Sequence, residues 1–422
     1  MKRVLCPQLL INLVGSLLVV TLLTISPVRA SPGTLYVAPG GNCGGVSPCY
    51  GNIQSAVNAA INGDEIRIAE GTYSQTSTGS GITAVVRIVD KKITLRGGYT
   101  TSDWNHSLPT THPAVIDADE DGIGLFINYQ ADIGLGAITI DGLSITDGNA
   151  TTAGAGTDSG GGILIDHTTH IVVTVQNCKI YDNIAEDGSG AGIWTTRSDN
   201  LLITASEVYS NQGSGIVVTY GDNTAIVDNN VHDNVGIGIS VISDLGDGTD
   251  IRANTVTGNQ GSGINLNTAT GGSMTDNVVT DNHTTGGGGG FDISGAVGDF
   301  LISGNTVSGN SALQGGGIDI SGSIAEIKNN VIESNFTTAT SNGGGGLYVD
   351  AGASGAYVLI SGNQILSNTT TNQGGGLLVL GSVDVQGNTI SGNSATSGGG
   401  LIATAQGTIS NNLISGNFIF LS

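Results

Sequence analysis

One hexapeptide, Asn211-Gln-Gly-Ser-Gly-Ile216, returns unchanged as Asn259-Gln-Gly-Ser-Gly-Ile264. In both copies the asparagine closes a short segment with the pattern apolar-x-x-Asn. Ten asparagines close such segments: Asn183, Asn211, Asn234, Asn259, Asn282, Asn310, Asn335, Asn368, Asn393 and Asn417. They lie about 26 residues apart on average, which is the length of one unit of a solenoid. Because a unit of this size cannot bury its apolar side alone, successive units must stack on one another.

Each unit has room for about three short strands and their turns. The Gly-x-Gly that usually follows the asparagine allows positive φ and a close approach of the chain. The asparagine amide can hydrogen-bond along a column of identical neighbours, as amides do in stacked strands. We therefore predict an all-β solenoid in which these asparagines and glycines are structural rather than catalytic.

The first 30 residues have the features of an export signal. Lys2 and Arg3 precede an apolar run over residues 9–25, and Val28-Arg29-Ala30 is typical of a cleavage site. An uncleaved membrane anchor is the alternative, since the run is nearly long enough to span a bilayer. We expect cleavage, and a mature protein that is secreted or lies at the cell surface.

Two further regions follow the signal. We expect residues 31–113 to form an N-terminal cap and the first turns of the solenoid, and residues 114–422 to form its regular repeats. Asn52 is a helix N-cap, and Ile53–Ile61 has the apolar spacing of an amphipathic helix laid over the first turn. Residues 103–113 break the strand pattern and predict a loop extruded from an early turn.

The chain is acidic, with 34 Asp and Glu against 12 Lys and Arg and a net charge of −22. This charge disfavours nucleic acid and acidic lipid surfaces as partners. Cys43 and Cys49 lie in one Gly- and Pro-containing loop, and in an exported protein they are expected to form a disulfide. Cys178 stands where later repeats carry asparagine, so we expect it to be a small buried residue.

Several segments resemble the right-handed parallel β-helix superfamily, which includes pectate lyases, polygalacturonases, alginate epimerases and surface proteins. The resemblance rests on the opening Ile53-Gln54-x-Ala56-Val57-x-x-Ala60 and on Gly63-Asp64-Glu65-Ile66-x-Ile68. Phrases such as Gly315-Gly-Gly-Ile318 and Ile390-Ser-Gly-Asn393 are similar to repeats of the chlamydial polymorphic outer-membrane proteins, which are adhesins. The resemblance implies a right-handed parallel β-helix with an N-terminal cap helix, and it covers nearly all of the chain after the signal.

The activity is less well specified than the fold. The acidic and Gly-His-Gly motifs of polygalacturonases and the Tyr-Gly-x-Asp-Pro-His signature of alginate epimerases are absent from the sequence. We therefore expect an extracellular interaction protein that binds glycans or mediates adhesion. The alternatives are a pectate lyase-like enzyme acting on uronic-acid polymers, which would need a basic residue and calcium, and a structural stalk.

One outward-facing column is the best candidate for glycan binding. Aligning the repeats on the apolar residue before the asparagine stacks two tyrosines and a histidine, with acids beside them: Tyr181, Tyr209, His232, Asp182 and Asp233. Aromatic rings beside carboxylates suit sugars, whose C–H faces pack on rings while their hydroxyls hydrogen-bond. The alternative is an aromatic ladder that stiffens the sheet.

Two groups of acids are candidates for calcium binding. A second alignment places Asn265, Asp292 and Asp319 in one outward column, where the two carboxylates suit calcium, proton transfer or a solvated face. The second group is the loop Asp244-Leu-Gly-Asp247-Gly-Thr-Asp250, with an ordinary Asx turn as the alternative. Calcium is therefore the candidate cofactor, with a solvated face and an Asx turn as the alternatives at the two groups.

The sequence ends on the apolar segment Asn417-Phe-Ile-Phe-Leu-Ser422. Three alternatives remain open for it. The segment folds over the last turn, it pairs end to end with another molecule, or a further C-terminal part continues the chain.

Overall fold

The computed structural model describes residues 31–130, 136–154, 158–185, 190–242, 248–267, 270–295, 297–322, 325–338, 343–352 and 357–420. The predicted signal, residues 1–30, lies outside them. From Pro32 on, the chain forms one compact unit of short, almost entirely parallel strands. No helix within these ranges is long and apolar enough to cross a bilayer.

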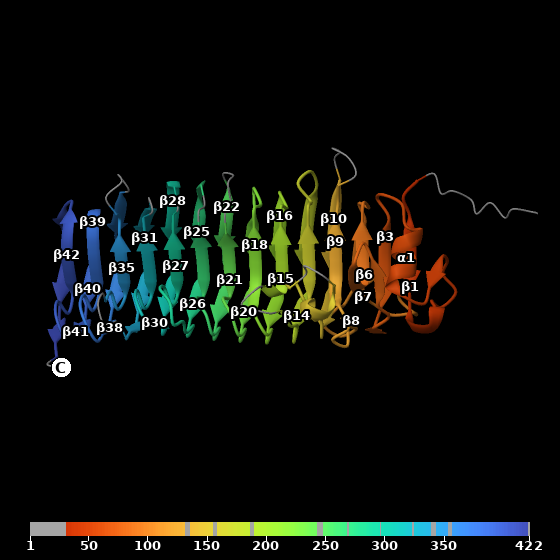
Figure 1. Ribbon diagram of the computed structural model, residues 1–422, viewed down its shortest axis with the longest axis horizontal. Helices are drawn as coiled ribbons and strands as arrows, with labels where there is room; N and C mark the ends of the chain where they lie inside the picture. Colours follow the sequence, from red (N-terminus) through yellow and green to blue (C-terminus); the bar gives the residue numbers. More distant parts are fainter. Residues whose placement is uncertain are drawn as a thin grey trace, which may run out of the picture. The chain divides into compact units, whose positions relative to one another are not determined.

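Each turn of the chain passes through three strand positions, which we call sheets C, A and B. Each strand pairs in parallel with the strands one turn before and after it, so the turns lie side by side (Figure 1). The predicted all-β parallel solenoid is confirmed.

Sheet A contains β1 Thr34–Val37, β3 Glu65–Ala69, β7 Thr94–Tyr99, β10 Ala137–Asp141, β13 Val172–Gln176, β16 Leu201–Thr204, β19 Ala225–Val227, β22 Thr249–Arg252, β25 Thr270–Thr275, β28 Val297–Ser303, β32 Ala325–Lys328, β36 Val358–Ser361, part of β39 Leu377–Gln386, and β43 Ile409–Ser410, with β2 Cys49–Tyr50 beside β1. Sheet B contains β4 Gly71–Tyr73, β8 Ala114–Asp117, β11 Leu143–Thr146, β14 Lys179–Tyr181, β17 Glu207–Tyr209, β20 Asn230–His232, β23 Thr255–Thr257, β26 Val278–Thr280, β29 Thr306–Ser308, β33 Val331–Glu333, β37 Gln364–Leu366, β40 Thr389–Ser391 and β44 Leu413–Ser415.

Sheet C contains β6 Ile82–Val89, β9 Ile123–Asn128, β12 Ile163–Asp166, β15 Gly190–Thr196, β18 Ser214–Thr219, β21 Ile239–Ile242, β24 Ile264–Asn267, β27 Phe291–Ser294, β31 Ile318–Ser321, β35 Leu347–Asp350, the first part of β39, and β42 Leu401–Gln406, with β5 Ser77–Gly79 antiparallel to β6. A short fourth sheet contains β30 Ser311–Ala312, β34 Phe336–Thr337, β38 Thr369–Thr370, β41 Ser394–Ala395 and β45 Phe418–Ile419. The helical segments are α1 Ile53–Ala59 and the 3₁₀ turns η1 Pro39–Gly41 and η2 Ala150–Thr152.

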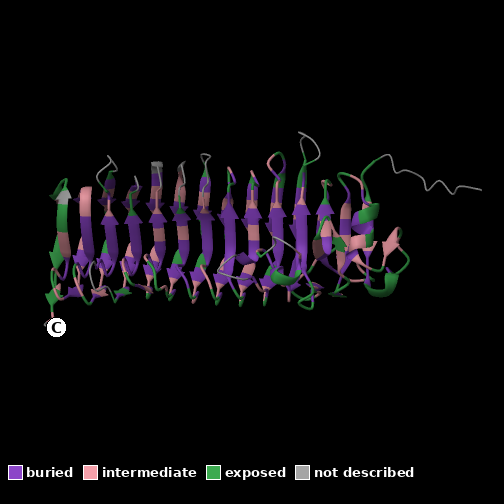
Figure 2. Ribbon diagram, viewed as in Figure 1, coloured by how far each residue is buried: buried purple, intermediate pink, exposed green. Residues whose placement is uncertain are grey.

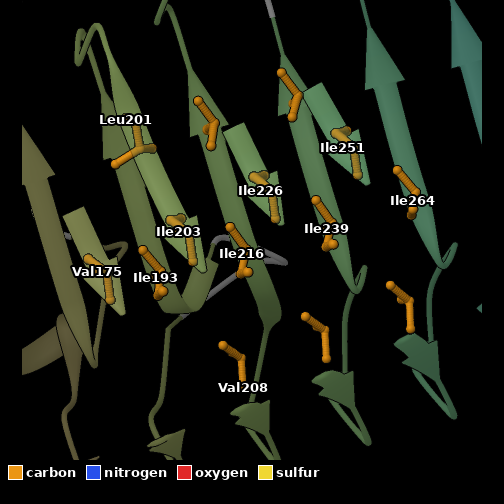
Figure 3. Close-up of a cluster of buried hydrophobic side chains, with 14 of the residues drawn as sticks. Val175, Ile193, Leu201, Ile203, Val208, Ile216, Ile226, Ile239, Ile251 and Ile264 are labelled. Atoms are coloured by element: carbon orange, nitrogen blue, oxygen red, sulfur yellow. The ribbon is translucent and has the colours of Figure 1, made fainter. Parts of the chain in front are cut away.

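The core is made of rows of identical aliphatic positions. In sheet C, Ile193, Ile216, Ile239 and Ile264 are register partners on consecutive turns, and all four are fully buried. A parallel row runs through sheet A, and Figure 3 shows both rows pointing into the same interior. Because side chains alternate along a strand, only every second residue enters this core. Outward positions of sheet C are often buried as well, as in β18, where all six residues are buried, so most central strands are coloured as buried in Figure 2.

All ten asparagines singled out by the sequence form one continuous ladder between sheets B and C. In the first nine, Nδ2 donates to the Oδ1 of the asparagine one turn later, at 2.9–3.1 Å. These amides are buried or partly buried, so the ladder satisfies polar groups that would otherwise be costly in the core. The predicted asparagine column is confirmed.

A second ladder lies between sheets A and B, five residues before the first in every turn. Its members are Asn229, Asn254, Asn277, Asn305, Asn330, Asn363, Asn388 and Asn412, joined at 2.9–3.1 Å. Ser206 and Cys178 occupy the two turns before Asn229. Cys178 is buried as expected, and burial raises the pKa of its thiol to about 12.

The cap helix α1 lies against the first turns of the solenoid, as predicted. The side chain of Asn52 accepts a hydrogen bond from the Ser55 N–H at 2.8 Å, which caps the helix. The helix buries Ile53 and Val57 in the core and ends at Ala59, so Ile61, which we expected on the helix, lies beyond it.

The predicted disulfide between Cys43 and Cys49 is present. The loop between β7 and β8 packs against it, because the buried Trp104 donates its Nε1–H to the Cys43 carbonyl at 3.1 Å and contacts the ring of Tyr36. The expectation of an extruded loop is therefore wrong for Trp104. The loop's length brings residues 107–110 back to the corner between sheets A and B.

The last described turn is exposed, in contrast with the central turns (Figure 2). Phe418 and Ile419 form β45, which pairs with β41 and leaves these residues 55% and 62% exposed. The alternative in which this segment folds over the last turn is therefore wrong for these two residues. End-to-end association stays a prediction.

Candidate functional site

A groove of about 680 Å³ opens at the corner between the end of sheet A and the start of sheet B. The loop between β7 and β8 forms one wall through Ser107, Pro109 and Thr110. Five consecutive turns contribute the remaining lining residues: Arg96, Asp141, Asn177, Cys178, Lys179, Ala205, Ser206, Glu207, Asp228 and Asn230. At a strand spacing of ~4.8 Å these turns extend over roughly 19 Å. Most of the lining side chains are polar, and the majority are carboxylates, amides or hydroxyls that can form hydrogen bonds.

Arg96 is held at one end of the groove by two carboxylates. Its Nε lies 2.9 Å from Asp141 Oδ2 and its Nη1 lies 3.2 Å from Glu65 Oε1. Asn177 donates to the other oxygen of Asp141 at 2.8 Å. Burial opposes the positive charge of Arg96, but the two carboxylates outweigh it and raise the pKa of the guanidinium. The charge is thus fixed and already compensated.

The positive charge of Lys179, on β14, is likewise compensated by a carboxylate, that of Glu207 on β17. Its Nζ lies 2.9 Å from Glu207 Oε2, and the hydrogen bond with Glu207 raises the pKa of Lys179. Burial opposes ionisation of Glu207, but Lys179 and His232 outweigh it, so the pKa of this carboxyl is lowered. His232 Nε2 lies 3.5 Å from the other oxygen of Glu207, which links the groove to the aromatic column.

The aromatic column lies on the same three strands of sheet B. Tyr181, Tyr209 and His232 are register partners, as predicted. The ring centroids of the two tyrosines are 5.2 Å apart at 10°, and those of Tyr209 and His232 are 5.1 Å apart at 4°. The rings therefore stack on each other along the solenoid, so Tyr209 presents its edge and hydroxyl to solvent rather than a face.

The two acids predicted beside this column are exposed at the corner that follows sheet B. Asp233 accepts a hydrogen bond from His232 Nδ1 at 2.8 Å and so orients the imidazole. Asp182 lies near Asp147, whose carboxyl has a raised pKa because of burial and then the neighbouring acids. The structure thus brings all five predicted residues to one edge of sheet B. Their role in sugar binding stays a prediction.

The predicted column in sheet C is also in register but is not a solvated face. Asn265, Asp292 and Asp319 pair across β24, β27 and β31, and Tyr348 follows on β35. Asp319 is only 6% exposed. A corner loop covers it so closely that a Cβ on Gly287 would lie 2.5 Å from its Oδ2.

Burial sets the ionisation of this pair. It raises the pKa of Asp319 to about 7, with the negative charge of Asp292 adding to the effect. Burial also raises the pKa of Asp292, which is opposed by a 3.2 Å hydrogen bond from Asn265. A carboxyl with this pKa can exchange a proton near neutrality, which is a property of general acids and bases.

The calcium expectation is not tested by these positions. Asp244 and Asp247 lie outside the described residues, and Asp250 accepts a 2.8 Å hydrogen bond from Arg252. Over the part of the chain that the structure describes, no group of three His, Cys, Asp or Glu side chains is placed to hold a metal ion. Asp292 and Asp319 form a pair with Asp350 close enough to add to the charge around Asp319.

Calcium binding has a direct test. If calcium binds, it should raise the melting temperature of the protein, because a ligand that binds only the folded state stabilises it. Differential scanning calorimetry with calcium and with EDTA measures this. An unchanged melting temperature would remove calcium from the account of this protein.

Sequence reasoning missed the groove residues Arg96, Asp141 and Asn177. They precede the first repeat that carries the asparagine pattern, so an alignment of repeats beginning at Cys178 does not include them. The usable signal was the long insertion at residues 103–113, because insertions at a solenoid corner often build a binding face.

Comparison with known proteins identifies a family and solved structures with a similar architecture. A family model described as a right handed beta helix region matches residues 119–246 and 161–336, which together cover more than half of the chain. A comparison with curated proteins found no match to this chain. The A-module of the mannuronan C-5 epimerase AlgE6 from Azotobacter vinelandii superposes with a TM-score of 0.51 at 15% identity, over 86% of this chain and 93% of that one.

The Dettilon tailspike protein (gp208) superposes with a TM-score of 0.52 at 17% identity, over 89% of this chain and 68% of the tailspike chain. At these identities the similarity shows the fold alone. Together with the match of the family model and the parallel register of every turn, it supports one conclusion: this chain belongs to the right-handed parallel β-helix family.

Proposed function

We propose that this protein binds carbohydrate in the groove between sheets A and B and along the adjoining aromatic column. The observation that carries the proposal is the groove itself, an open, polar hollow that crosses five turns beside Tyr181 and Tyr209. Its length of roughly 19 Å suits an oligosaccharide segment better than a single sugar. A flat repetitive sheet without such a hollow would not support this proposal.

The groups in the groove match the hydrogen-bonding needs of sugar hydroxyls. The carboxylates of Glu207 and Asp228 accept hydrogen bonds, while the amide of Asn230 and the hydroxyl of Thr110 both donate and accept. Tyr181 and Tyr209 lie on the strands that carry Lys179 and Glu207, and burial raises the pKa of both phenols, so they remain protonated donors. Sugar contacts here would be made by ring edges and hydroxyls, because stacking within the column occupies both faces of Tyr209.

The fold and the disulfide are compatible with this proposal. A protein of the same fold is a mannuronan C-5 epimerase, so polysaccharide chemistry is one use of this architecture. We also propose that the protein is exported, since the Cys43–Cys49 disulfide suits an oxidising compartment and the first 30 residues have the pattern of a signal.

A lyase is the less favoured alternative because its chemistry needs a free base. Each of the nine basic residues from Arg67 to Lys328 already contacts a carboxylate, a carbonyl, a histidine or an aromatic ring: Arg67, Arg87, Lys91, Lys92, Arg96, Lys179, Arg197, Arg252 and Lys328. A structural stalk would need no groove.

Removing the two tyrosines tests the proposal. The double variant Tyr181→Ala/Tyr209→Ala should lose retention on polysaccharide-containing affinity gels while its circular dichroism remains β-rich, because sheet B keeps its core residues Ile180 and Val208. The matched control is Tyr220→Ala/Tyr357→Ala, which removes two exposed tyrosines from outside the groove. Equal retention of the two double variants would argue against the proposed site.

A further inference from the structure

We infer that the groove selects neutral glycans over uronic-acid polymers. This inference rests on the proposed carbohydrate-binding function and adds the class of ligand. It depends on how the charges that line the groove are already paired.

Both cations in the groove lining are neutralised from within the protein. Lys179 pairs with Glu207 at 2.9 Å, and Arg96 lies between Asp141 and Glu65 at 2.9 and 3.2 Å. Recognition of a carboxylate normally uses an Arg or Lys whose donors are free to point at the ligand. A uronate entering this groove would have to compete with these carboxylates for cations whose charge is already compensated.

Displacing Asp141 would be costly. Asp141 is 9% exposed and is fixed by Arg96 and by the amide of Asn177. Breaking this pair would leave a buried carboxylate without its cation, which is one of the largest penalties in a protein interior. The Arg96 end of the groove therefore rejects an anionic ligand.

The remaining charges act in the same direction. The lining contains two cations and three carboxylates, and Glu65 adds a fourth carboxylate behind Arg96. The whole chain carries a net charge of −22. A polyanionic chain is thus repelled both locally and at long range. A neutral sugar pays no such cost, and its hydroxyls can donate to Glu207 and Asp228.

The test compares oligosaccharides that differ only at C6. Mannan and mannuronan oligomers of equal length and linkage form one pair, and cello-oligosaccharides with their C6-oxidised counterparts form another. Isothermal titration calorimetry at physiological salt with EDTA should show at least about tenfold tighter binding of the neutral member. Tighter or equal binding of the uronate would overturn the inference and leave carbohydrate binding intact.

The variant Glu207→Gln tests the cause. It frees Lys179 from its carboxylate while keeping the size of the side chain, so the preference for neutral sugars should fall by about tenfold. The control is Glu326→Gln, which alters a similar ion pair with Lys328 at 2.9 Å on sheet A, outside the groove. An unchanged preference in Glu207→Gln would contradict the charge argument. If no member of either pair binds, the proposed function itself fails, and the inference fails with it.

Discussion

Replacing Asn259 by alanine should lower the free energy of unfolding by about 4 kcal/mol. Its Oδ1 accepts hydrogen bonds from the backbone N–H and the Nδ2 of Asn234, at 3.1 and 2.9 Å. Its Nδ2 donates to the Val231 carbonyl at 3.2 Å and to Asn282 at 2.9 Å. Alanine removes all of these bonds and leaves buried partners unsatisfied, because Asn259 lies 1% exposed in the middle of the ladder. Urea denaturation followed by circular dichroism measures the change.

The neighbouring amide provides a matched control. Gln260 is exposed, and Gln260→Ala should change the stability by less than about 0.5 kcal/mol. In a solenoid each turn contacts only its neighbours, so the loss at Asn259 should be felt by the turns on both sides. Similar denaturation midpoints for the two variants would mean that the ladder does not stabilise the fold.

The ladder also shows why the fold could be predicted from the sequence. Stacked turns present the same environment to equivalent positions, so Asn183 and Asn417 obey the same constraint although they are far apart in the chain. The strand registers followed from the same repeat, including the partners of Tyr181 and Asp292. Because equivalent positions in successive turns are under the same constraint, the repeat of the structure is visible in the sequence.

The site was less predictable because it depends on the irregular parts of the chain. The groove exists where one long insertion returns to a corner, and the spacing of the repeats says nothing about the path of that insertion. Likewise, the outward position of Asp319 followed from the alignment, but its burial depends on the loop that carries Gly287. Sequence periodicity therefore gives the direction of a side chain and not what covers it.

The burial of Asp319 leads to the second large predicted effect. Removing the negative charge of its carboxylate should increase the stability of the protein. The pKa of Asp319 is about 7 in the folded protein, against 3.8 for an ordinary aspartate. Between these two values the folded state holds a proton on Asp319 that the unfolded state has released, so the contribution of Asp319 to stability is greatest below pH 4 and falls as the pH rises through 7. At 1.36 kcal/mol for each pKa unit, the loss amounts to about 4 kcal/mol at pH 8.

Asp319→Asn should remove this dependence, because the amide is uncharged at every pH. In EDTA we expect the variant and the wild type to be equally stable near pH 4, and the variant to be more stable by about 4 kcal/mol at pH 8. The control Asp384→Asn should show no such gain, because hydrogen bonds from Thr408 and Tyr357 lower the pKa of Asp384. A variant that is less stable than the wild type at pH 8 would show that the ionised carboxylate is favoured in the fold.

Calcium would oppose the stability gain expected for Asp319→Asn at pH 8. Its effect therefore distinguishes calcium binding from proton exchange as the role of Asp292 and Asp319. A bound cation would favour ionised Asp292 and Asp319 and would offset the cost of burying them. Adding calcium at pH 8 should then stabilise the wild type and leave Asp319→Asn unaffected. Equal responses of the two proteins would place any calcium site elsewhere and leave the buried pair as a proton-holding element of the fold.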